Sequence, residues 1–241
     1  IMELLIITDA LRRASARSIT AIVPYMGYGR QDARAPFARM PITARLLADL
    51  MKTAGVGHMV TLDLHAEQIE GFYHFPVDNV YGTQVLIDAL ASQSCRENMV
   101  VVSPDSSGVG QASLVSEALG CPLAIIDRRQ QDDTTALHLI GDVAQKTCWL
   151  FDDMIDTGHK LVQAASALQE HGAQQIHACA VHPIFSNNAI DQLKQTPIEQ
   201  ILVTDTIPLS DLAKGLPNLQ VCSITQHLAT FIKDAFALPS I

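Results

Sequence analysis

Short apolar runs alternate along this chain with stretches whose apolar residues recur at helical spacing. Runs typical of β-strands occupy residues 19–24, 59–64, 99–103, 123–126, 148–151, 176–181 and 201–203. Helical patterns lie between them, at residues 42–53, 84–91, 111–119, 161–171 and 188–194. Alternation of this kind predicts an α/β fold built on parallel sheets. Ligands of such sheets bind at the carboxyl ends of the strands, so the residues directly after each run are candidate site residues.

The strongest of these candidates is residues 148–160, which read CWLFDDMIDTGHK. An apolar strand leads into Asp152 and Asp153, and a short turn then leads into a helix that begins near Lys160. Backbone N–H groups at a helix start favour a phosphate, to which Thr157 and Lys160 add a hydroxyl and a charge. The two carboxylates are placed to accept hydrogen bonds from sugar hydroxyls. Three Asp within five residues favour such a site over an acidic N-cap of an ordinary helix.

Composition excludes several classes of protein. Apolar residues make up 48% of the chain and charged residues 17%, which is enough for a core and too little charge for disorder. No apolar run is long enough to span a membrane. Five scattered Cys without CxxC spacing argue against a disulfide framework or a zinc site and favour a reducing, cytoplasmic setting. The formal charge of −9 offers no basic field for nucleic acid but suits a protein that gathers cations to hold phosphates.

The first residues show helical spacing without a preceding cap or a signal peptide. We therefore expect that this chain begins inside an element and that an N-terminal piece precedes it. A domain boundary is expected near residues 82–90, after a turn region at 76–82 that is rich in Pro, Asp, Asn and Gly.

The loop at 152–160 resembles the ribose-phosphate-binding loop DDMIDTGGT of the ribose-phosphate pyrophosphokinases, with seven of nine positions in agreement. Through that loop it is also similar to the type I phosphoribosyltransferases. Further blocks resemble the same family in the same order, at residues 9–16, 28–32, 41–44, 63–69, 76–80, 102–105, 182–186 and 205–210. The resemblance thus covers nearly the whole chain.

The resemblance implies two tandem phosphoribosyltransferase-like (type I) parallel-sheet domains, the first of them incomplete. Residues 1–84 would be the C-terminal part of the first domain and residues 85–225 the second. Residues 226–241 would form a C-terminal helix that returns to the first domain. A homo-oligomer, of the hexamer-of-dimers type found in the family, and a cytoplasmic location are also implied.

The implied reaction is attack of the ribose 1-hydroxyl of ribose 5-phosphate on the β-phosphorus of ATP, with Mg²⁺, to release AMP. Such a transfer depends on positioning, metal ions and cations. The resemblance assigns ribose 5-phosphate to Asp152, Asp153, Asp156, Thr157, Gly158, His159 and Lys160, and ATP to Arg30, Gln31, Asp32 and Arg34. It assigns Mg²⁺ to His65 and Asp105, and the catalytic cation to Arg128. Without the resemblance, residues 28–34 read equally well as a solvated loop, His65 as a core or surface residue, and Asp105 as an acidic turn residue.

Several positions depart from the family pattern. Arg128 stands where the family has a catalytic Lys, and Gln130 where it has an assisting Arg, in a segment that we expect to be a loop. His159 and Lys160 replace Gly and Thr, so His159 is expected to crowd the phosphate and Lys160 to compensate with charge. A Gly and an Arg are also missing after Asp105, and Ala33 replaces a basic residue.

These departures reduce the positive charge near the phosphates and leave a second hypothesis open. In it, the protein is a catalytically weak or silent paralogue that binds nucleotide or sugar phosphate and regulates an active partner. A third hypothesis, a phosphoribosyltransferase that consumes the product, shares the loop at 152–160. The Arg-Gln-Asp block at 30–32 and the Asp-Leu-His block at 63–65 argue against the third.

Overall fold

The computed structural model describes residues 1–34, 37–92, 98–131 and 134–237, and it divides into two compact units at Tyr81 and Gly82. The predicted boundary at residue 84 and the assignment of residues 226–241 to the first domain remain predictions. In the described part of the chain, no helix combines the length and the apolarity that a membrane span requires.

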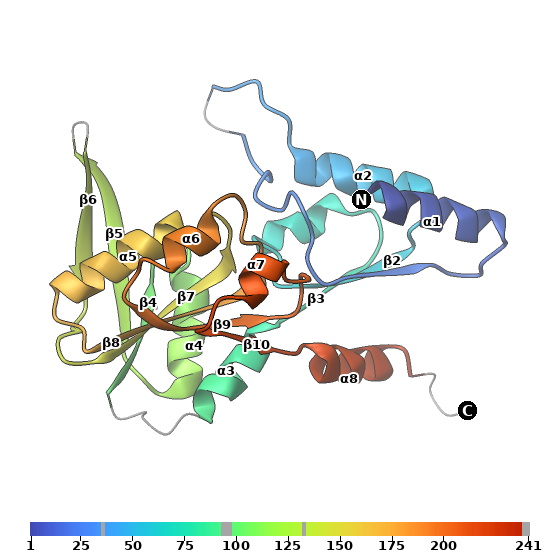
Figure 1. Cartoon of the computed structure of the whole chain (residues 1–241). Helices are drawn as coiled ribbons and strands as arrows, with labels where there is room; N and C mark the ends of the chain where they lie inside the picture. Colours follow the sequence, from blue (N-terminus) through green and yellow to red (C-terminus); the bar gives the residue numbers. More distant parts are fainter. Residues whose placement is uncertain (35–36, 93–97, 132–133, 238–241) are drawn as a thin grey trace. The chain divides into compact units, whose positions relative to one another are not determined.

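The first unit is a small three-stranded parallel sheet with helices (Figure 1). Its strands β1 (Thr20–Val23), β2 (His58–Leu62) and β3 (Val77–Val80) lie side by side in that order. Its helices are α1 (Met2–Arg13), α2 (Thr43–Ala54) and the short 3₁₀ helix η1 (Glu67–Phe72). Residues 76–82 were predicted as a turn region, and this was wrong for residues 77–80, which form β3. Parallel pairing of β3 with β2 overrides the low strand propensity of Asp78 and Asn79. The Oδ2 atom of Asp78 also accepts a hydrogen bond from Nε2 of His58 on β2 at 2.8 Å.

The second unit contains a seven-stranded sheet in the order β10-β9-β8-β7-β4-β5-β6. The strands are β4 (Met99–Ser103), β5 (Leu123–Gln131), β6 (Thr134–Ile140), β7 (Thr147–Ile155), β8 (Gln175–Pro183), β9 (Ile198–Thr204) and β10 (Leu219–Cys222). All neighbours are parallel except β5 and β6, which form an antiparallel pair. The α/β architecture with parallel sheets confirms the predicted fold class.

Helices cover both faces of this sheet, which explains why its central strands read as continuous apolar runs. The helices of the unit are α3 (Thr83–Ala91), α4 (Val109–Leu119), α5 (His159–Glu170), α6 (Ala189–Leu193), α7 (Asp211–Lys214) and α8 (Thr225–Ala235). Alternate residues of β4 and β7 enter two separate cores. Val102 and Leu150 pack with α5 and α6, whereas Val101 and Trp149 pack with α3 and α4. The Trp149 ring lies 4.6 Å from the ring of His177 on β8.

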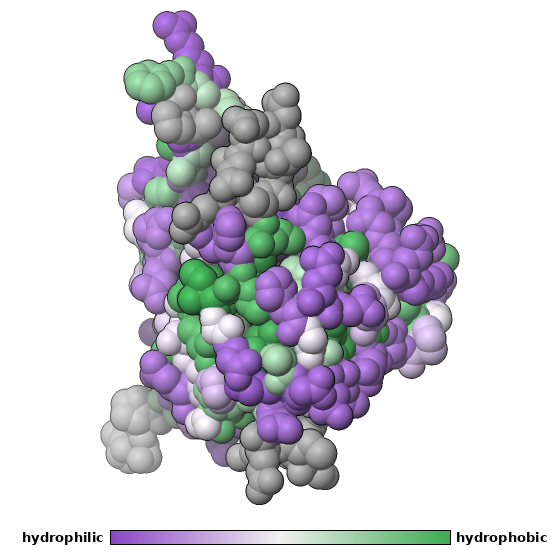
Figure 2. Space-filling model, turned by 90° about the vertical axis from the view of Figure 1, so that its left-hand side faces the viewer, coloured by the Kyte–Doolittle hydropathy of each residue, from purple (hydrophilic) through white to green (hydrophobic). Residues whose placement is uncertain are grey.

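Two strands in this sheet were not predicted, because their local patterns are weak. β6 has the mixed sequence TTALHLI and pairs only at the edge of the sheet, and β10 has four residues. Figure 2 looks onto the side of the molecule on which β5 and β6 lie, and there apolar side chains gather among a surrounding majority of hydrophilic ones. Leu137 and Leu139 of β6 are partly buried against the core on the α5 side of the sheet.

The turn after β6 depends on Gly141. Its φ of +116° is a conformation that side chains rarely adopt, and a Cβ there would lie 2.8 Å from the Cβ of Ala124 on β5. We expect Gly141→Ala to lower the free energy of unfolding by about 2–4 kcal/mol, because backbone strain and overpacking both act. Urea denaturation measures the change.

Gly110→Ala is the matched control, since Gly110 lies in α4 with nothing within 4 Å of the added Cβ. This control should be neutral or stabilising by up to about 1 kcal/mol, as Ala favours helix. Equal losses in the two variants would contradict the role given to Gly141.

Candidate functional site

The strands β4 and β7 are neighbours, but the chain leaves them in opposite directions. From β4 it passes through α4 to β5, and from β7 it passes through α5 to β8 on the other side. Such a reversal of strand order is where open α/β sheets bind their ligands, at the carboxyl ends of the strands. The residues that follow β4 and β7 are therefore the candidate site of the second unit.

The turn from β7 into α5 forms a helix N-terminus that is open to an anion. Gly158 precedes the helix with φ +79°, and no side chain caps the first turn. The N–H of Val162 donates to the carbonyl of Gly158 at 3.0 Å, so the N–H groups of residues 159–161 lie ahead of the first intrahelical bond. A 12-residue helix presents these groups together with the positive end of its dipole. The side chain of His159, the first helical residue, is exposed.

The segment after β8 braces this turn. The N–H groups of Phe185 and Ser186 donate to the carbonyls of Ile155 and Asp156 at 2.9 and 3.0 Å. The Ser186 hydroxyl also donates to the Asp156 carboxylate. Phe185 adopts a positive φ of 47°, which is rare for a bulky residue and accompanies these contacts. Ser186 was not assigned to the site from the sequence, although its block at 182–186 was recognised.

Asp152 and Asp153 lie within β7, and the prediction that the strand ends before them was wrong. The strand continues to Ile155 because it keeps pairing with β8 as far as Pro183. Strand alternation turns Asp152 toward the side of the sheet that carries α5. Both carboxylates are buried, with 5% and 7% of the residue exposed. Burial raises the pKa of Asp152 to about 7, although the nearby Lys160 opposes this shift.

Asp105 lies in the turn after β4 and is held by four donors. Its Oδ1 atom accepts from the Ser107 N–H at 2.9 Å, the Ser107 hydroxyl at 2.6 Å and the Gly108 N–H at 3.1 Å. Its Oδ2 atom lies 2.8 Å from the ammonium of Lys160. Burial acts to raise the pKa of Asp105, but the hydrogen bonds from Lys160 and Ser107 outweigh it and lower that pKa to about 2.

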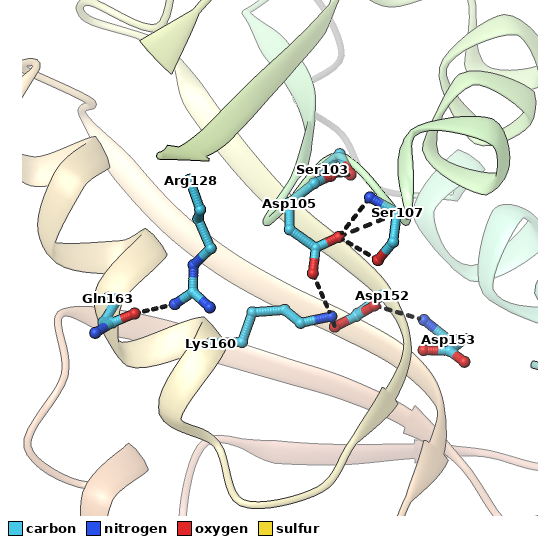
Figure 3. A network of polar contacts seen from close by, with 9 residues as sticks. Ser103, Asp105, Ser107, Arg128, Asp152, Asp153, Lys160 and Gln163 are labelled. Carbon is cyan, nitrogen blue, oxygen red and sulfur yellow. Dashed lines mark hydrogen bonds and ion pairs between the residues drawn. The ribbon is translucent and has the colours of Figure 1, made fainter. Parts of the chain in front are cut away.

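Lys160 also lies 2.9 Å from Oδ2 of Asp152, so one ammonium joins two carboxylates (Figure 3). Its own pKa is raised: burial acts to lower it, and the charges and hydrogen bonds of Asp152 and Asp105 outweigh that effect. The pKa values of the two carboxyl groups shift in opposite directions. Asp152 is more deeply buried and lies next to Asp153, whereas Asp105 receives more hydrogen bonds. The sequence predicted Lys160 as a phosphate ligand; in the structure its ammonium is bound to carboxylates.

Arg128 lies on β5, and the prediction that it belongs to a loop was wrong. β5 runs on to Gln131 because it pairs with β6 along residues 125–131. The guanidinium donates to the side-chain oxygen of Gln163 on α5 (Figure 3). Its Nε is buried and has no hydrogen-bond partner among the described residues. The side chain of Gln130 and the pair Asp132–Asp133 lie outside the described part of the chain.

The residues assigned to ATP follow β1 in the first unit. The carbonyl of Gln31 accepts the Ala44 N–H at the start of α2 at 3.2 Å, and Asp32 accepts a hydrogen bond from Gln68 at 3.0 Å. Arg30 and Arg34 are exposed. The exposed His65 lies beside this loop, since a Cβ on Gly29 would be 3.5 Å from the His65 Cβ. The structure therefore brings the expected ATP loop and the expected metal ligand together.

The fit of these residues to Mg²⁺ differs between the two expected ligands. His65 belongs to the first unit, whereas Asp105 belongs to the second, and their joint role in one metal site stays a prediction. In the arrangement described, both oxygens of Asp105 are already engaged, one of them by an ammonium. Among the described residues, no three His, Cys, Asp or Glu side chains are grouped so that they could hold a metal ion. Asp105 therefore does not fit a divalent metal ion while Lys160 stays in place.

Comparison with known proteins decides the family. Residues 1–55 match the N-terminal domain of ribose phosphate pyrophosphokinase, and residues 127–240 match the phosphoribosyl synthetase-associated domain. A ribose-phosphate pyrophosphokinase of Chromobacterium violaceum is 48% identical over 97% of this chain and 72% of its own length. The chain belongs to the ribose-phosphate pyrophosphokinase family. The resemblance seen in the motifs is thereby confirmed, and with it membership in a family of transferases.

Further similar proteins support this family assignment. The protein of that name from Haemophilus influenzae is 48% identical over 97% of this chain and 75% of its own length. Among solved structures, phosphoribosylpyrophosphate synthetase from Mycobacterium smegmatis superposes with a TM-score of 0.91 at 42% identity. That match covers 98% of this chain and 77% of the other.

Sequence reasoning missed three other groups that the site uses: Ser107, Gly108 and Gln163. Ser107 and Gly108 follow Asp105 at the spacing of an Asx turn, in which an Asp side chain accepts N–H groups two and three residues later, so a signal for them was present. Gln163 has no comparable signal, because its contact with Arg128 depends on how α5 packs over β5.

The raised pKa of Asp152 predicts a pH dependence of stability. The folded state holds its proton up to about pH 7, whereas the unfolded chain releases it near the ordinary value of 3.8. Between these values the unfolded state binds fewer protons, so the free energy of unfolding should fall as pH rises from 4 to 7. Asp152→Asn should flatten this fall, measured by urea denaturation at several pH values.

Asp142→Asn serves as the control, because Asp142 is fully exposed and its pKa is lowered, chiefly by a hydrogen bond from Lys146. This variant should keep the fall between pH 4 and 7. An unchanged profile in Asp152→Asn would show that the Asp152 carboxyl is not the group responsible.

Proposed function

We propose that this protein is a ribose-phosphate pyrophosphokinase, which transfers the pyrophosphoryl group of ATP to ribose 5-phosphate to give phosphoribosyl pyrophosphate and AMP. The oxygen of the ribose 1-hydroxyl forms a bond to the β-phosphorus, the bond from that phosphorus to the α–β bridging oxygen breaks, and the hydroxyl proton is lost. The identity of 48% over 97% of the chain is the observation that carries this proposal. The resemblance of residues 152–158 to the family's ribose-phosphate loop supports it as well.

Ribose 5-phosphate is proposed to bind at the turn between β7 and α5. The N–H groups at the start of α5 would hold the 5-phosphate, with Thr157 and Gly158 next to it. Asp152 and Asp153 would accept hydrogen bonds from the ribose hydroxyls, an arrangement that fits buried carboxylates. Asp156 is tied to Ser186 and would hold the turn in shape. The expectation that His159 crowds the phosphate remains a prediction.

ATP is proposed to bind at the loop after β1. Arg30 and Arg34 are exposed and would contact the phosphates, Gln31 offers an amide to the base, and Asp32 is fixed by Gln68. Mg²⁺ is proposed to accompany ATP, with His65 beside the loop as a ligand. When bound there, the metal ion would neutralise negative charge on the polyphosphate. A homo-oligomer and a cytoplasmic location complete the proposal.

Arg128 is proposed as the cation that stabilises the charge developing on the phosphoryl oxygens. It lies in the second unit, as the ribose-phosphate turn does, and one buried nitrogen of its guanidinium has no protein partner among the described residues. Gln163 holds the other side of the guanidinium, which makes it a positioning residue. Fixed donors of this kind act without reorganisation when the charge develops.

One assay tests the proposed function: release of AMP from ATP with ribose 5-phosphate and Mg²⁺. Release that requires the sugar phosphate supports the proposal. A protein that binds both substrates and releases no AMP would instead be the silent, partner-regulating paralogue. The engagement of Lys160 by two carboxylates favours that second hypothesis, since it removes a cation from the phosphates.

Removal of the two buried carboxylates should abolish binding of ribose 5-phosphate. We expect the double variant Asp152→Asn with Asp153→Asn to show no heat of binding in calorimetry, because sugar hydroxyls lose both charged acceptors. The Asn residues keep the size of the side chains and thus the packing of β7. A control variant, Asp191→Asn, changes an exposed carboxylate on α6 and should bind normally. Unchanged affinity in the double variant would rule out this binding site.

Arg128→Gln should lower turnover by roughly 10²–10³, the usual effect of losing one electrostatic donor. Arg128→Lys with Gln130→Arg should raise turnover above that of the unmodified protein, since a compact ammonium replaces the forked guanidinium and a charge is added. Gln163→Ala keeps the charge of Arg128 and should cost less than Arg128→Gln. Steady-state AMP release measures all three variants. Turnover in Arg128→Gln equal to that of the unmodified protein would show that Arg128 is not the transition-state cation.

A further inference from the structure

The ammonium of Lys160 occupies the point on which two carboxylates converge. Oδ2 of Asp105 and Oδ2 of Asp152 lie 2.8 and 2.9 Å from its nitrogen. The two acids come from different elements, the turn after β4 and strand β7, and Lys160 reaches them from the first turn of α5 (Figure 3). The contact therefore links the start of α5 to the turn after β4 and to β7.

The other carboxylate oxygens fix the orientation of this pair. Oδ1 of Asp105 accepts from Ser107 and Gly108, and Oδ1 of Asp152 accepts from the N–H of Asp153 at 3.2 Å. The two Oδ2 atoms are thus turned toward the same cation. The side chains of Asp105 and Asp152 are only 16% and 6% exposed. Water therefore hydrates these carboxylates little, and the ammonium compensates their charge.

We propose that Lys160 is a tethered cation that stands in for a divalent metal ion at Asp105 and Asp152, so that this pair binds no divalent ion while Lys160 is present. Two carboxylate oxygens directed at one point suit an ammonium or a hard metal ion. The distances of 2.8 and 2.9 Å from the Lys160 nitrogen to the two oxygens are typical of an ammonium, whereas Mg²⁺ requires about 2.0–2.1 Å to each oxygen. The ammonium and a metal ion cannot share the position.

The consequence concerns the metal of the proposed reaction. Divalent ions would enter with ATP on the side of His65, and the second unit would supply its own positive charge through Lys160. The pair with Lys160 carries a net charge of one negative unit when all three groups are ionised, and without Lys160 it carries two. Removal of the ammonium should therefore create a site for divalent cations where none existed.

Binding of Mn²⁺, followed by electron paramagnetic resonance without nucleotide at pH 7.5 and 8.5, tests this inference; the higher pH is included because loss of Lys160 raises the pKa of Asp152 further. Lys160→Met keeps the aliphatic stem and removes the charge. We expect this variant to gain one Mn²⁺ site with an affinity at least about tenfold above the weak surface binding of the unmodified protein. Adding Asp105→Asn to Lys160→Met should abolish the gained site. Lys194→Met is the matched control, because it removes an exposed ammonium from Asp191 and should gain no site.

Identical Mn²⁺ isotherms for the unmodified protein and Lys160→Met would overturn the inference, as would a gained site that survives Asp105→Asn. Lys160→Gln provides a second neutral variant if the Met variant does not fold, as judged by circular dichroism. The measurement needs no turnover, and binding of ribose 5-phosphate to the same variants is measured separately. A failure of the proposed function is therefore distinguishable from a failure of the tethered cation.

Discussion

Neighbouring strands β4 and β7 send the chain in opposite directions, and the chemistry of the second unit depends on this divergence. Because α4 crosses toward β5 and α5 toward β8, the connections that follow these two strands lead away from each other. Asp105, Asp152 and the start of α5 are therefore brought to one place. Carboxylates buried this closely destabilise one another unless a cation or several N–H groups compensate them. Lys160 and the turn at Ser107 and Gly108 supply both kinds of compensation.

This arrangement ties binding to folding. The helix start that would hold a phosphate also carries Lys160, and the strand that would hold the sugar also carries Asp152. Arg128 and Gln163 connect β5 to the same helix. Each element of the site thus has a second role in packing, and β5 and β7 continue as strands where loops would otherwise be expected. In the first unit, the loop after β1 is joined in the same way to α2 and to the segment after β2.

The sequence predicted the parts of this structure that depend on local pattern. Continuous apolar runs marked β4, β7 and β8, because both faces of these strands are covered. The acidic end of β7 and the following helix marked the ribose-phosphate turn. Contacts between distant residues were beyond such reasoning. β3 and the extension of β5 exist through pairing with other strands, and the hold of Lys160 on Asp105 joins residues 55 positions apart. From the sequence alone, a Lys beside a helix start is interpreted as a phosphate ligand. Its contact with Asp105 becomes visible only when the position of the neighbouring strand β4 is known.

Trp149, buried in β7 against His177, gives this protein an optical probe. It is the one tryptophan in 241 residues, so emission excited at indole wavelengths reports on the second unit and on β7 in particular. Burial lowers the pKa of His177, whose imidazole lies next to this indole. Trp149 lies three residues before Asp152 on the same strand, so its fluorescence provides a label-free signal for ligands that bind at the end of β7.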